Sequence, residues 1–421
     1  MGASQTRDTM DGHPAGGRLW SSSGLLPLRL PCRVRSPWEE RTRPGNSGHR
    51  GLHGGRSRQA HPEAGGLRNH LGPVILGTGQ PVDLSAYTLQ RGYARGHGRW
   101  WGTAVGTRAA VPIDGTSLAR ELKQEVAQGV ADLLSKGIRP GLATVSFEGD
   151  FAAAAYERGL RRLASDLRFY YRCDTLPQDV EEADAVAAVG KLNAAPDVSG
   201  IVILRPLPSQ ISEGAMCQEL DPLKDVEAVH PTNAGLLALG RPRYVPSTAA
   251  SCFYLLDRYM LASGRDPLEF YARSNMVVVG RSANVGRPAS LLGLARNATV
   301  VCCDEHTFRA GNLYEYTRNA DILVVAAGVA GLIRGDHVKE GVIAVDVGIN
   351  PVASSTGVVS IVGDIDQGTV AERAEAITPV PGGVGPVTSV WLLKSTVQAA
   401  RLVAGLDDVK PPTETVPLEV G

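Results

Sequence analysis

Residues 277–288 read Val277-Val-Val-Gly280-Arg-Ser-Ala-Asn-Val-Gly286-Arg-Pro288, and this stretch decides the fold. Its short β-branched run is typical of a parallel strand covered on both faces, and Gly280 ends the run where a tight turn must follow. Gly286 lets the backbone approach a pyrophosphate closely at the start of a helix near Pro288. The stretch therefore predicts a dinucleotide-binding strand, turn and helix. Because the spacing departs from the common G-x-G-x-x-G pattern, an ordinary strand–loop–helix connection is the alternative.

Short apolar strands alternate with helical segments on both sides of this unit. Such alternation predicts an α/β protein whose parallel sheets carry helices on their faces. The expected elements before the unit are helices at 118–134 and 156–164 and strands at 142–147, near Phe169 and at 200–204, followed by a helix at 247–261. The expected strands of one dinucleotide-binding sheet are 276–279, 299–303, 322–326, 342–347 and 357–362. The predicted architecture is a Rossmann-type domain preceded by a second α/β domain.

The first 110 residues differ from the rest of the chain in composition. They contain 15 Arg, no Lys and 6 acidic residues, with no sustained helical or strand period. An Arg-rich arm is typical of nucleic-acid binding, and an Arg-rich, acid-poor leader is typical of an organellar transit segment. Because no core-forming pattern appears, we instead expect a disordered or non-native extension over 1–110 that takes no part in fold or activity. Residues 405–421 are expected to form a frayed tail.

Composition also argues against several classes of protein. The six cysteines show no zinc-ligand spacing and no disulfide framework, which favours a reducing compartment. No pair of histidines has ligand or triad spacing, so no metal site is expected. No apolar run reaches the ~18 residues that a membrane span needs. We therefore expect a soluble, cytoplasmic protein with neither a membrane nor a nucleic-acid partner.

Four motifs together carry a resemblance to a known family. They are Gly280-Arg-Ser-Ala-Asn-Val-Gly286-Arg-Pro288, Asp346-Val-Gly-Ile-Asn350, Gly363-Asp-Ile-Asp366 and Thr378-Pro-Val-Pro-Gly-Gly-Val-Gly-Pro386. In combination they resemble the bifunctional methylenetetrahydrofolate dehydrogenase/cyclohydrolase family over about residues 111–404. Weaker matches are Pro206-Leu-Pro208, Lys224-Asp-Val226 and Pro231-Thr-Asn-Ala-Gly235.

The resemblance implies two domains that flank a cleft. It implies a folate-binding catalytic domain over 111–246, completed by a C-terminal helix at 387–404, and a Rossmann-type cofactor domain over 247–386. It also implies a tetrahydrofolate derivative as substrate, NAD or NADP as cofactor, and a homodimer. The glycine-rich stretch 379–386, which is too rich in Gly and Pro for regular structure, is expected to lie in the cleft.

Specific residues receive roles through the same resemblance. Tyr156 would stack on folate and Glu227 would anchor the pterin ring, so these two are the expected catalytic residues. The expected substrate-binding residues are Tyr156, Glu227, Pro381, Gly382 and Gly383. The expected cofactor-binding residues are Gly280, Arg281, Ser282, Gly286, Asp304, Glu305, Gly328 and Asn350. The alternative for Glu227, taken by itself, is an acid on a surface loop.

The chain departs from the family pattern in the folate site. The family's Tyr-x-x-x-Lys motif has Leu160 at the lysine position, and the glutamine that partners this lysine aligns with Leu204. Arg205 stands where the family has Leu, and Glu227-Ala228 replaces its Asp-Gly. Leucine cannot perform the proton transfer that hydrolysis of a methenyl product needs, and such help is typically worth about 10²–10⁴-fold.

We therefore predict methylenetetrahydrofolate dehydrogenase activity without cyclohydrolase activity. Hydride transfer mainly needs the donor carbon to be held against the nicotinamide, which is positioning work. The alternatives are the full bifunctional enzyme and a non-catalytic folate- or nucleotide-binding paralogue.

The end of the strand expected at 299–303 bears on the choice of cofactor. Asp304-Glu305 stands where NADP-using members have His-Ser, and an acid there suits an adenosine ribose with a free 2′-hydroxyl. A carboxylate ~4 Å from a phosphate charge would repel it by about 4 kcal/mol at an effective dielectric of about 20, before screening. Arg281 acts in the opposite direction, and the alternative is that both acids point into solvent. We predict a preference for NAD over NADP.

Overall fold

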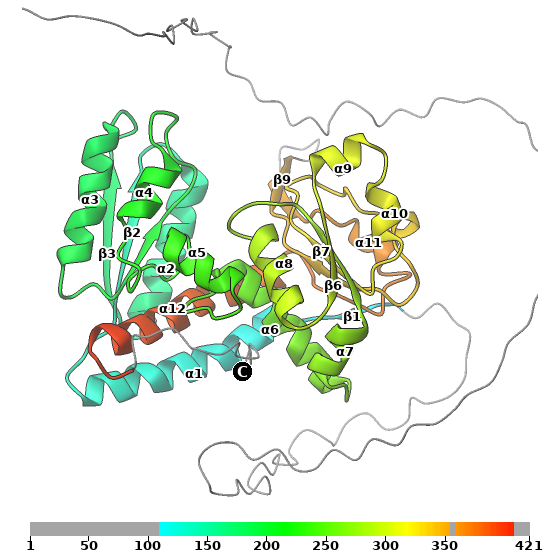
Figure 1. Ribbon diagram of the computed structural model, residues 1–421, viewed down its shortest axis with the longest axis horizontal. Coiled ribbons are helices and arrows are strands. Elements are labelled where there is room, and N and C mark those ends of the chain that lie inside the picture. The colour runs from blue at the N-terminus through cyan, green and yellow to red at the C-terminus, as the bar shows by residue number, and fades with distance from the viewer. Residues whose placement is uncertain (1–108, 354–358, 408–421) are drawn as a thin grey trace, which may run out of the picture. The chain divides into compact units, whose positions relative to one another are not determined.

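The structure is a computed structural model that describes residues 109–353 and 359–407. The extension expected over 1–110 and the tail expected over 405–421 therefore lie largely outside the described residues. The described residues form two parallel sheets that carry helices on their faces (Figure 1). The predicted α/β class is confirmed.

The first sheet has three parallel strands in the order β3-β2-β4. Strand β2 (Gly141–Phe147) lies between β3 (Tyr170–Leu176) and β4 (Gly200–Ile203), and it is buried along its whole length. Helix α2 (Phe151–Asp166) connects β2 to β3, and α3 (Glu182–Ala194) connects β3 to β4. Helix α2 is longer than the predicted 156–164 because Asp150 caps it, accepting a hydrogen bond from Ala153 N at 2.6 Å.

The second sheet has six strands in the order β1-β11-β8-β7-β5-β6, and every neighbouring pair is parallel. The strands are β1 (Val111–Pro112), β5 (Asn275–Val279), β6 (Thr299–Cys303), β7 (Ile322–Val325), β8 (Ile343–Asp346) and β11 (Ala376–Ile377). After β5 the chain forms β6 on one side and then crosses to β7 on the other side of β5. The carboxyl end of β5 is therefore a topological switch point, where open parallel sheets bind ligands.

The prediction that 357–362 is a fifth strand of this sheet is wrong. Strands β9 (Asn350–Ala353) and β10 (Val359–Val362) pair antiparallel and form a separate two-stranded sheet. In the predicted sheet, 357–362 would follow the strand at 342–347 after only residues 348–356, and a parallel crossover needs about a dozen residues or more. The edge of the six-stranded sheet is instead occupied by β11 and β1.

Strand β1 ties the start of the described chain to the second sheet. Ala110 N donates to Ala371 O and Val111 N donates to Glu375 O, each at 2.9 Å. Residues 111–112, which we expect from the sequence in the domain over 111–246, thus belong to the six-stranded sheet. The other expected limits, at 246/247 and 386/387, stay predictions.

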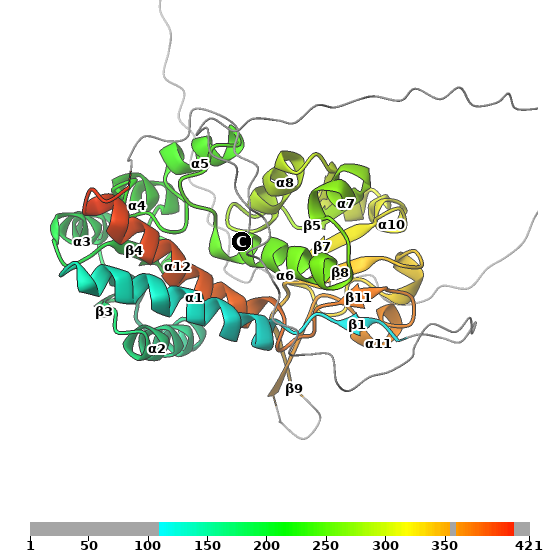
Figure 2. The same ribbon diagram turned by 90° about the horizontal axis from the view of Figure 1, so that it is seen from below.

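Three helices, α1 (Gly115–Ser135), α12 (Val384–Val403) and α6 (Ser247–Ala262), pack side by side (Figures 1 and 2). Helix α12 lies between the other two, and α6 also packs against α8 (Gly286–Ala295) of the second sheet. Helix α12 begins at Val384, so the Gly and Pro residues at 385 and 386 are part of its first turn rather than of an irregular loop. Proline is tolerated there because first-turn N–H groups have no partner within the helix.

The sequence of α1 explains its position. Its buried residues recur at helical spacing and form one apolar face; they are Gly115, Ala119, Leu122, Val126, Val130 and Leu133. Asp114 caps the helix by accepting from Thr116 N at 2.9 Å and Ser117 N at 3.1 Å.

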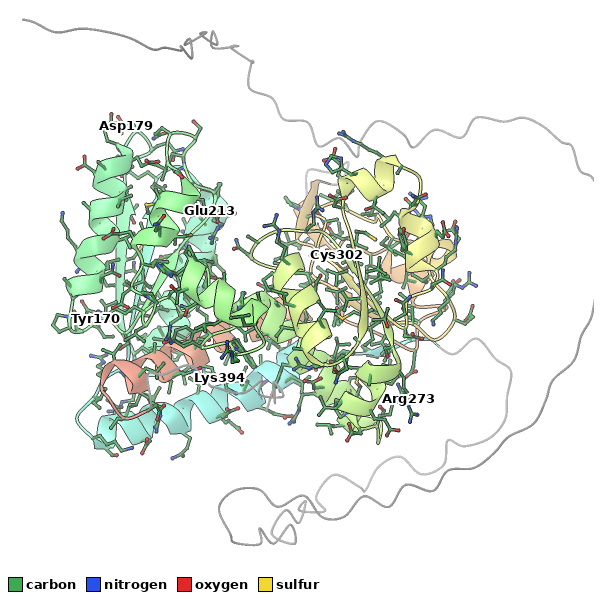
Figure 3. The ribbon with its side chains drawn as sticks, in the orientation of Figure 1. Tyr170, Asp179, Glu213, Arg273, Cys302 and Lys394 are labelled. Carbon is green, nitrogen blue, oxygen red and sulfur yellow. The ribbon has the colours of Figure 1, made fainter. Side chains whose placement is uncertain are left out.

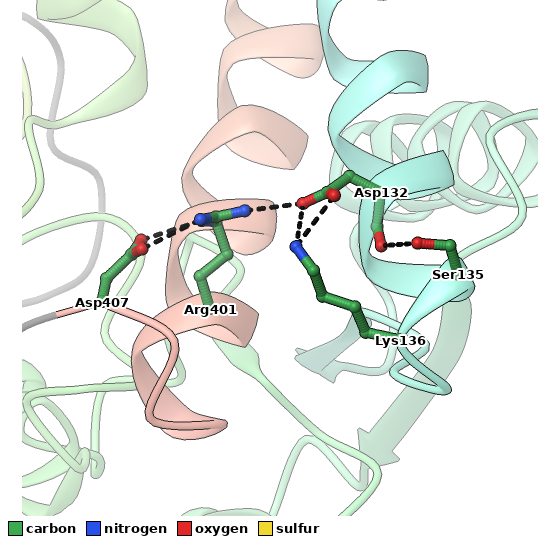
Figure 4. Close-up of polar contacts among 5 residues, drawn as sticks. All are labelled: Asp132, Ser135, Lys136, Arg401 and Asp407. Carbon is green, nitrogen blue, oxygen red and sulfur yellow. Dashed lines mark hydrogen bonds and ion pairs between the residues drawn. The ribbon is translucent and has the colours of Figure 1, made fainter.

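An ion-pair group joins the far ends of α1 and α12 (Figure 4). Arg401 donates to Asp132 at 2.9 Å and to both carboxylate oxygens of Asp407, while Lys136 also pairs with Asp132. These side chains are between about a third and two fifths exposed, so solvent screens their attraction and the group adds little stability.

The remaining helices are short. They are α4 (Glu213–Glu219), α5 (Pro231–Ala238), α7 (Pro267–Arg273), α9 (Glu305–Arg309), α10 (Leu313–Thr317), α11 (Gln367–Val370) and a 3₁₀ turn (Gly335–His337). Among the helices that the structure describes, none has both the length and the apolar character needed to traverse a bilayer.

One arginine is fully enclosed where α6, α7 and α8 meet. Arg296 is 1% exposed, its Nη2 lies 3.3 Å from Asp257 Oδ2, and its guanidinium lies over the Phe253 ring at 4.6 Å and the Tyr271 ring at 5.5 Å. Tyr271 Oη also donates to Asp257 at 2.7 Å. A buried pair of this kind is costly to break, because the remaining carboxylate would stay buried without its counter-charge.

We predict that Arg296→Met lowers the free energy of unfolding by about 3 kcal/mol or more, since it leaves Asp257 without its cation. Urea unfolding followed by circular dichroism measures this change. Arg273→Met is the matched control: Arg273, labelled in Figure 3, pairs with Glu269 but its side chain is 78% exposed. The control should change the unfolding free energy by no more than about 0.5 kcal/mol. Equal effects of the two substitutions would contradict the prediction.

Candidate functional site

A cavity of about 650 Å³ is the candidate site, and its size suits a small-molecule ligand. Its wall is formed by α2, the end of β4, Glu227, the start of α6, the turn after β5, residues 346–349 and 379–386, and the first turns of α12. All five predicted substrate-binding residues line it: Tyr156, Glu227, Pro381, Gly382 and Gly383.

The α2 side of the site is apolar at the position where the family has lysine. Leu160 is 1% exposed and Leu204 is 6% exposed, and both belong to the same core cluster. Among the described residues that line the cavity, the ionisable side chains are Tyr156, Arg205, Glu227 and Asp346, and none is a lysine. The two leucines thus replace a polar pair with packed hydrocarbon.

The Lys224-Asp225 motif holds the backbone that presents Glu227. Lys224 Nζ donates to Asn193 O at 2.7 Å and to Ala195 O at 2.8 Å, which satisfies carbonyls at the end of α3. Asp225 is fully buried and accepts from Val229 N, His230 N and Asn233 Nδ2. The motif is therefore structural, and it fixes the segment that leads into α5.

Glu227 has an unusual environment for a carboxyl group. Its side chain is about a quarter exposed, within the cavity, and Arg205 Nη1 lies 3.8 Å from its Oε2. Burial raises the pKa of Glu227 to about 7, although the charge of Arg205 opposes the increase. Near neutral pH the group therefore exists in both protonation states, which suits proton transfer or a pH-dependent hydrogen bond.

Tyr156 lines the same cavity as Glu227 and lies close enough to be affected by its charge. The residue is 39% exposed and its hydroxyl contacts Ser389 on α12. Desolvation, with the charge of Glu227 second, raises the pKa of Tyr156 to about 12. The phenol therefore stays neutral and can act as a stacking surface and a hydrogen-bond donor.

The glycine-rich stretch is placed by the start of α1. Thr116 N donates to Gly382 O at 3.1 Å, and Thr378 N donates to Ala344 O at 3.0 Å, so the stretch is anchored to α1 and to β8. The expectation that 379–386 lines the cleft agrees with its place on the cavity wall.

The turn after β5 is closed by backbone contact. Gly280 has a φ of 110°, and a Cβ built on Gly286 would lie 1.9 Å from Gly280 O. Only glycine allows that approach. Ser282 Oγ accepts from Val285 N at 3.2 Å and steadies the start of α8. The turn lies at the switch point of the sheet and leads into a helix N-terminus, so its geometry fits a dinucleotide phosphate.

The acids after β6 have specific partners. Asp304 Oδ2 lies 2.5 Å from Arg281 Nη2, and Asp304 also caps α9 by accepting from Thr307 N at 3.1 Å. Glu305 pairs with Arg309 one helical turn further along. Asp304 therefore does not simply point into solvent, and it neutralises Arg281.

Gly328 and Asn350 share one partner, Asp364. The carboxylate of Asp364 accepts from Ala327 N, Gly328 N and Val329 N at 2.6–2.9 Å, and from Asn350 Nδ2 at 2.8 Å. Both predicted cofactor residues thus belong to the scaffold of the turn after β7.

Several wall residues were not singled out from the sequence. Asn284 and Asp346 line the cavity, and burial is the main reason that the pKa of Asp346 is raised to about 6. Arg205 was recognised only as a departure from the family pattern, because nothing in one sequence shows that it faces Glu227. No group of three or more His, Cys, Asp or Glu within residues 109–353 and 359–407 is arranged to hold a metal ion.

Comparison with protein families finds two matching models. Residues 113–227 match the catalytic domain of tetrahydrofolate dehydrogenase/cyclohydrolase, and residues 246–404 match its NAD(P)-binding domain. The family resemblance carried by the motifs is confirmed.

Individual proteins agree with the models. The bifunctional protein FolD 3 of Rubrobacter xylanophilus is 63% identical over 294 residues, which are 69% of this chain and 92% of that relative. The crystal structure of the bifunctional enzyme FolD from Campylobacter jejuni is 35% identical with a TM-score of 0.64, and covers 70% of this chain and 99% of its own. FolD of Trypanosoma brucei, solved with NADP and an inhibitor, is 33% identical with a TM-score of 0.65 and the same coverage.

We predict that Gly286→Ala weakens NAD binding at least tenfold, because the added Cβ would collide with Gly280 O and open the turn. Fluorescence titration measures the affinity, and circular dichroism verifies that the variant is folded. The control is Gly159→Ala in α2, where an added Cβ meets nothing within 4 Å. The control should bind NAD normally and gain up to about 1 kcal/mol of helix stability. Normal NAD affinity in folded Gly286→Ala would refute the prediction.

Proposed function

The chain belongs to the tetrahydrofolate dehydrogenase/cyclohydrolase family, and on that premise we propose that it oxidises 5,10-methylenetetrahydrofolate to 5,10-methenyltetrahydrofolate but has lost cyclohydrolase activity. NAD or NADP, when bound, supplies the hydride acceptor. The turn at 280–286 would hold its phosphates, and the cavity next to this turn would hold the folate.

The chain's own residues would act by positioning the substrate. The ring of Tyr156 would stack on the folate, and the ionised carboxylate of Glu227 would accept hydrogen bonds from the pterin N–H groups. These contacts would fix the donor carbon relative to the turn after β5. Holding the reacting atoms in place in this way is how a protein can accelerate hydride transfer. Pro381, Gly382 and Gly383 would form the opposite wall.

The observation that carries the loss of cyclohydrolase is the packing of Leu160. It is 1% exposed within the core cluster that also contains Leu204, so no amine stands where the family's lysine does. Arg158, Arg161 and Arg162 on the same helix are poor replacements, because guanidinium groups stay protonated and cannot accept a proton.

One observation favours the full bifunctional enzyme instead. A carboxyl with a pKa raised to about 7 in a ligand cavity is suited to general base catalysis, and Glu227 has both properties. Relatives that are similar to this chain are named as bifunctional.

The decisive assay incubates the protein with 5,10-methylenetetrahydrofolate and each nicotinamide cofactor, and follows reduced cofactor and methenyl absorbance separately. We predict that reduced cofactor forms and that the methenyl compound accumulates. Hydrolysis of the methenyl compound clearly above the buffer rate at the same pH would favour the bifunctional enzyme. Absence of any reduction, despite measurable folate or NAD binding, would favour a non-catalytic paralogue.

We also propose that NAD is preferred over NADP, because Asp304 occupies the guanidinium of Arg281 that could otherwise pair with a 2′-phosphate. The ratio of kcat/KM for NAD to that for NADP is expected to exceed ten. Asp304→Ser keeps a capping side chain on α9 but frees Arg281, so it should lower this ratio at least tenfold. Glu305→Ser is the matched control, since it removes an acid without freeing Arg281. A native preference for NADP that Asp304→Ser leaves unchanged would show that Asp304 does not face the ribose.

A homodimer and a cytoplasmic location are also part of the proposal. The antiparallel pair β9 and β10 supports the dimer, because its apolar Val352 is exposed outside the cavity.

A further inference from the structure

Two departures from the family pattern lie in contact in the folded chain. Arg205 follows β4, and Glu227 lies on a separate segment before α5, yet Arg205 Nη1 lies 3.8 Å from Glu227 Oε2. The family pattern has Leu and Asp at these positions. A new cation and a lengthened acid have therefore appeared together on one cavity wall.

Arg205 is also held by groups other than Glu227. Its Nε donates to Glu213 Oε1 on α4 at 2.7 Å, and its Nη1 donates to Ile203 O at 3.1 Å. Glu213, labelled in Figure 3, lies at the start of α4. The guanidinium is only about a quarter exposed, so these contacts fix it in place with one side directed at Glu227.

The other charged or titratable groups that act on Glu227 do not replace this cation. Asp225 on its own segment and Glu213 on α4 are acids that disfavour its ionised form. Tyr156 on α2 and Cys217 on α4 are also close enough to interact with it, and both are neutral when protonated. Within the described part of the chain, Arg205 is thus the cation that opposes the burial of this carboxyl.

We propose that Arg205 is a positioning residue that increases the ionised fraction of Glu227 and directs its side chain into the cavity, so that the carboxylate can accept hydrogen bonds from a ligand with adjacent N–H donors. Such donors are found on a 2-aminopyrimidinone ring. The identity of the ligand rests on the proposed function, whereas the effect of Arg205 on Glu227 does not.

The first test needs no ligand. The titration of the Glu227 carboxyl is followed by NMR in the full chain labelled with [¹³C]glutamate, and its signal is identified by its loss in Glu227→Gln. An opposite charge at this distance typically lowers the pKa of a carboxyl by about 1–3 units, so Arg205→Leu should raise the Glu227 midpoint by about one pH unit or more. Arg205→Lys should retain most of the native midpoint, and Arg162→Leu on the exposed side of α2 should leave it unchanged. An unchanged midpoint in folded Arg205→Leu would overturn the proposal.

The second test separates positioning from a purely structural role. With 5,10-methylenetetrahydrofolate, the KM of Arg205→Leu should exceed the native value about tenfold at pH 7 and approach it about two pH units higher, where Glu227 ionises without help. A structural defect would instead raise KM equally at every pH. Arg205→Lys should restore the native pH dependence, and a pH-independent defect in both variants would count against the proposal.

The two tests also separate this inference from the proposed function. If the native protein does not turn over the folate, the proposed function fails while the NMR titration still decides the role of Arg205. If the titration is unaffected by Arg205, the inference fails whatever the substrate is. The double variant Arg205→Leu/Glu227→Asp restores the family pair. Its loss of affinity for the folate should be smaller than the sum of the losses in Arg205→Leu and Glu227→Asp.

Discussion

The carboxyl-end edge of the six-stranded sheet depends on two buried carboxylates, Asp346 and Asp364. Asp346 is 1% exposed and accepts from Gly348 N, Asp364 N and Ile365 N, while Asp364 is fully buried and accepts from three N–H groups after β7. Each carboxylate replaces water for a set of turn donors that would otherwise be buried without partners. Gly363 is needed beside them, because a Cβ there would lie 1.8 Å from Asp346 Oδ2.

This arrangement explains why segments far apart in the sequence meet at one site. The ends of β7 and β8, the antiparallel pair and the glycine-rich stretch are all fixed with respect to these two acids, because Thr378 Oγ1 also accepts from Asp346 N. The turn at 280–286 meets the same region through Gly280, which packs against Ala326 O. The part of the site around the turn at 280–286 is thus formed mainly by backbone, and side chains such as Asp346 and Asp364 hold that backbone in place.

The folate half of the site is built differently, and the departures from the family pattern are concentrated there. Leu160 is packed into the core and Leu204, which belongs to the same core cluster, lines the cavity, whereas Arg205 and Glu227 face the cavity and each other. The segment before Glu227 keeps the family motif at Lys224 and Asp225, and both side chains are hydrogen-bonded. Of the residues that differ from the family pattern, Glu227 thus lies on a segment whose backbone contacts are ordered by Lys224 and Asp225.

The sequence by itself determined the α/β class, the family and most strands, because these depend on local periodicity and on glycines at fixed spacing. It also singled out Tyr156, Glu227 and the stretch 379–386, all of which line one cavity in the structure. It misassigned 357–362, because a short apolar run has the same pattern in a parallel sheet and in an antiparallel pair. Only the tertiary structure decided that Arg205 faces Glu227, that Asp304 pairs with Arg281, and that Val111–Pro112 joins the second sheet. Each of these contacts joins residues that are distant in sequence. Which residues pair depends on their burial and orientation in the folded chain, and no local sequence pattern encodes these.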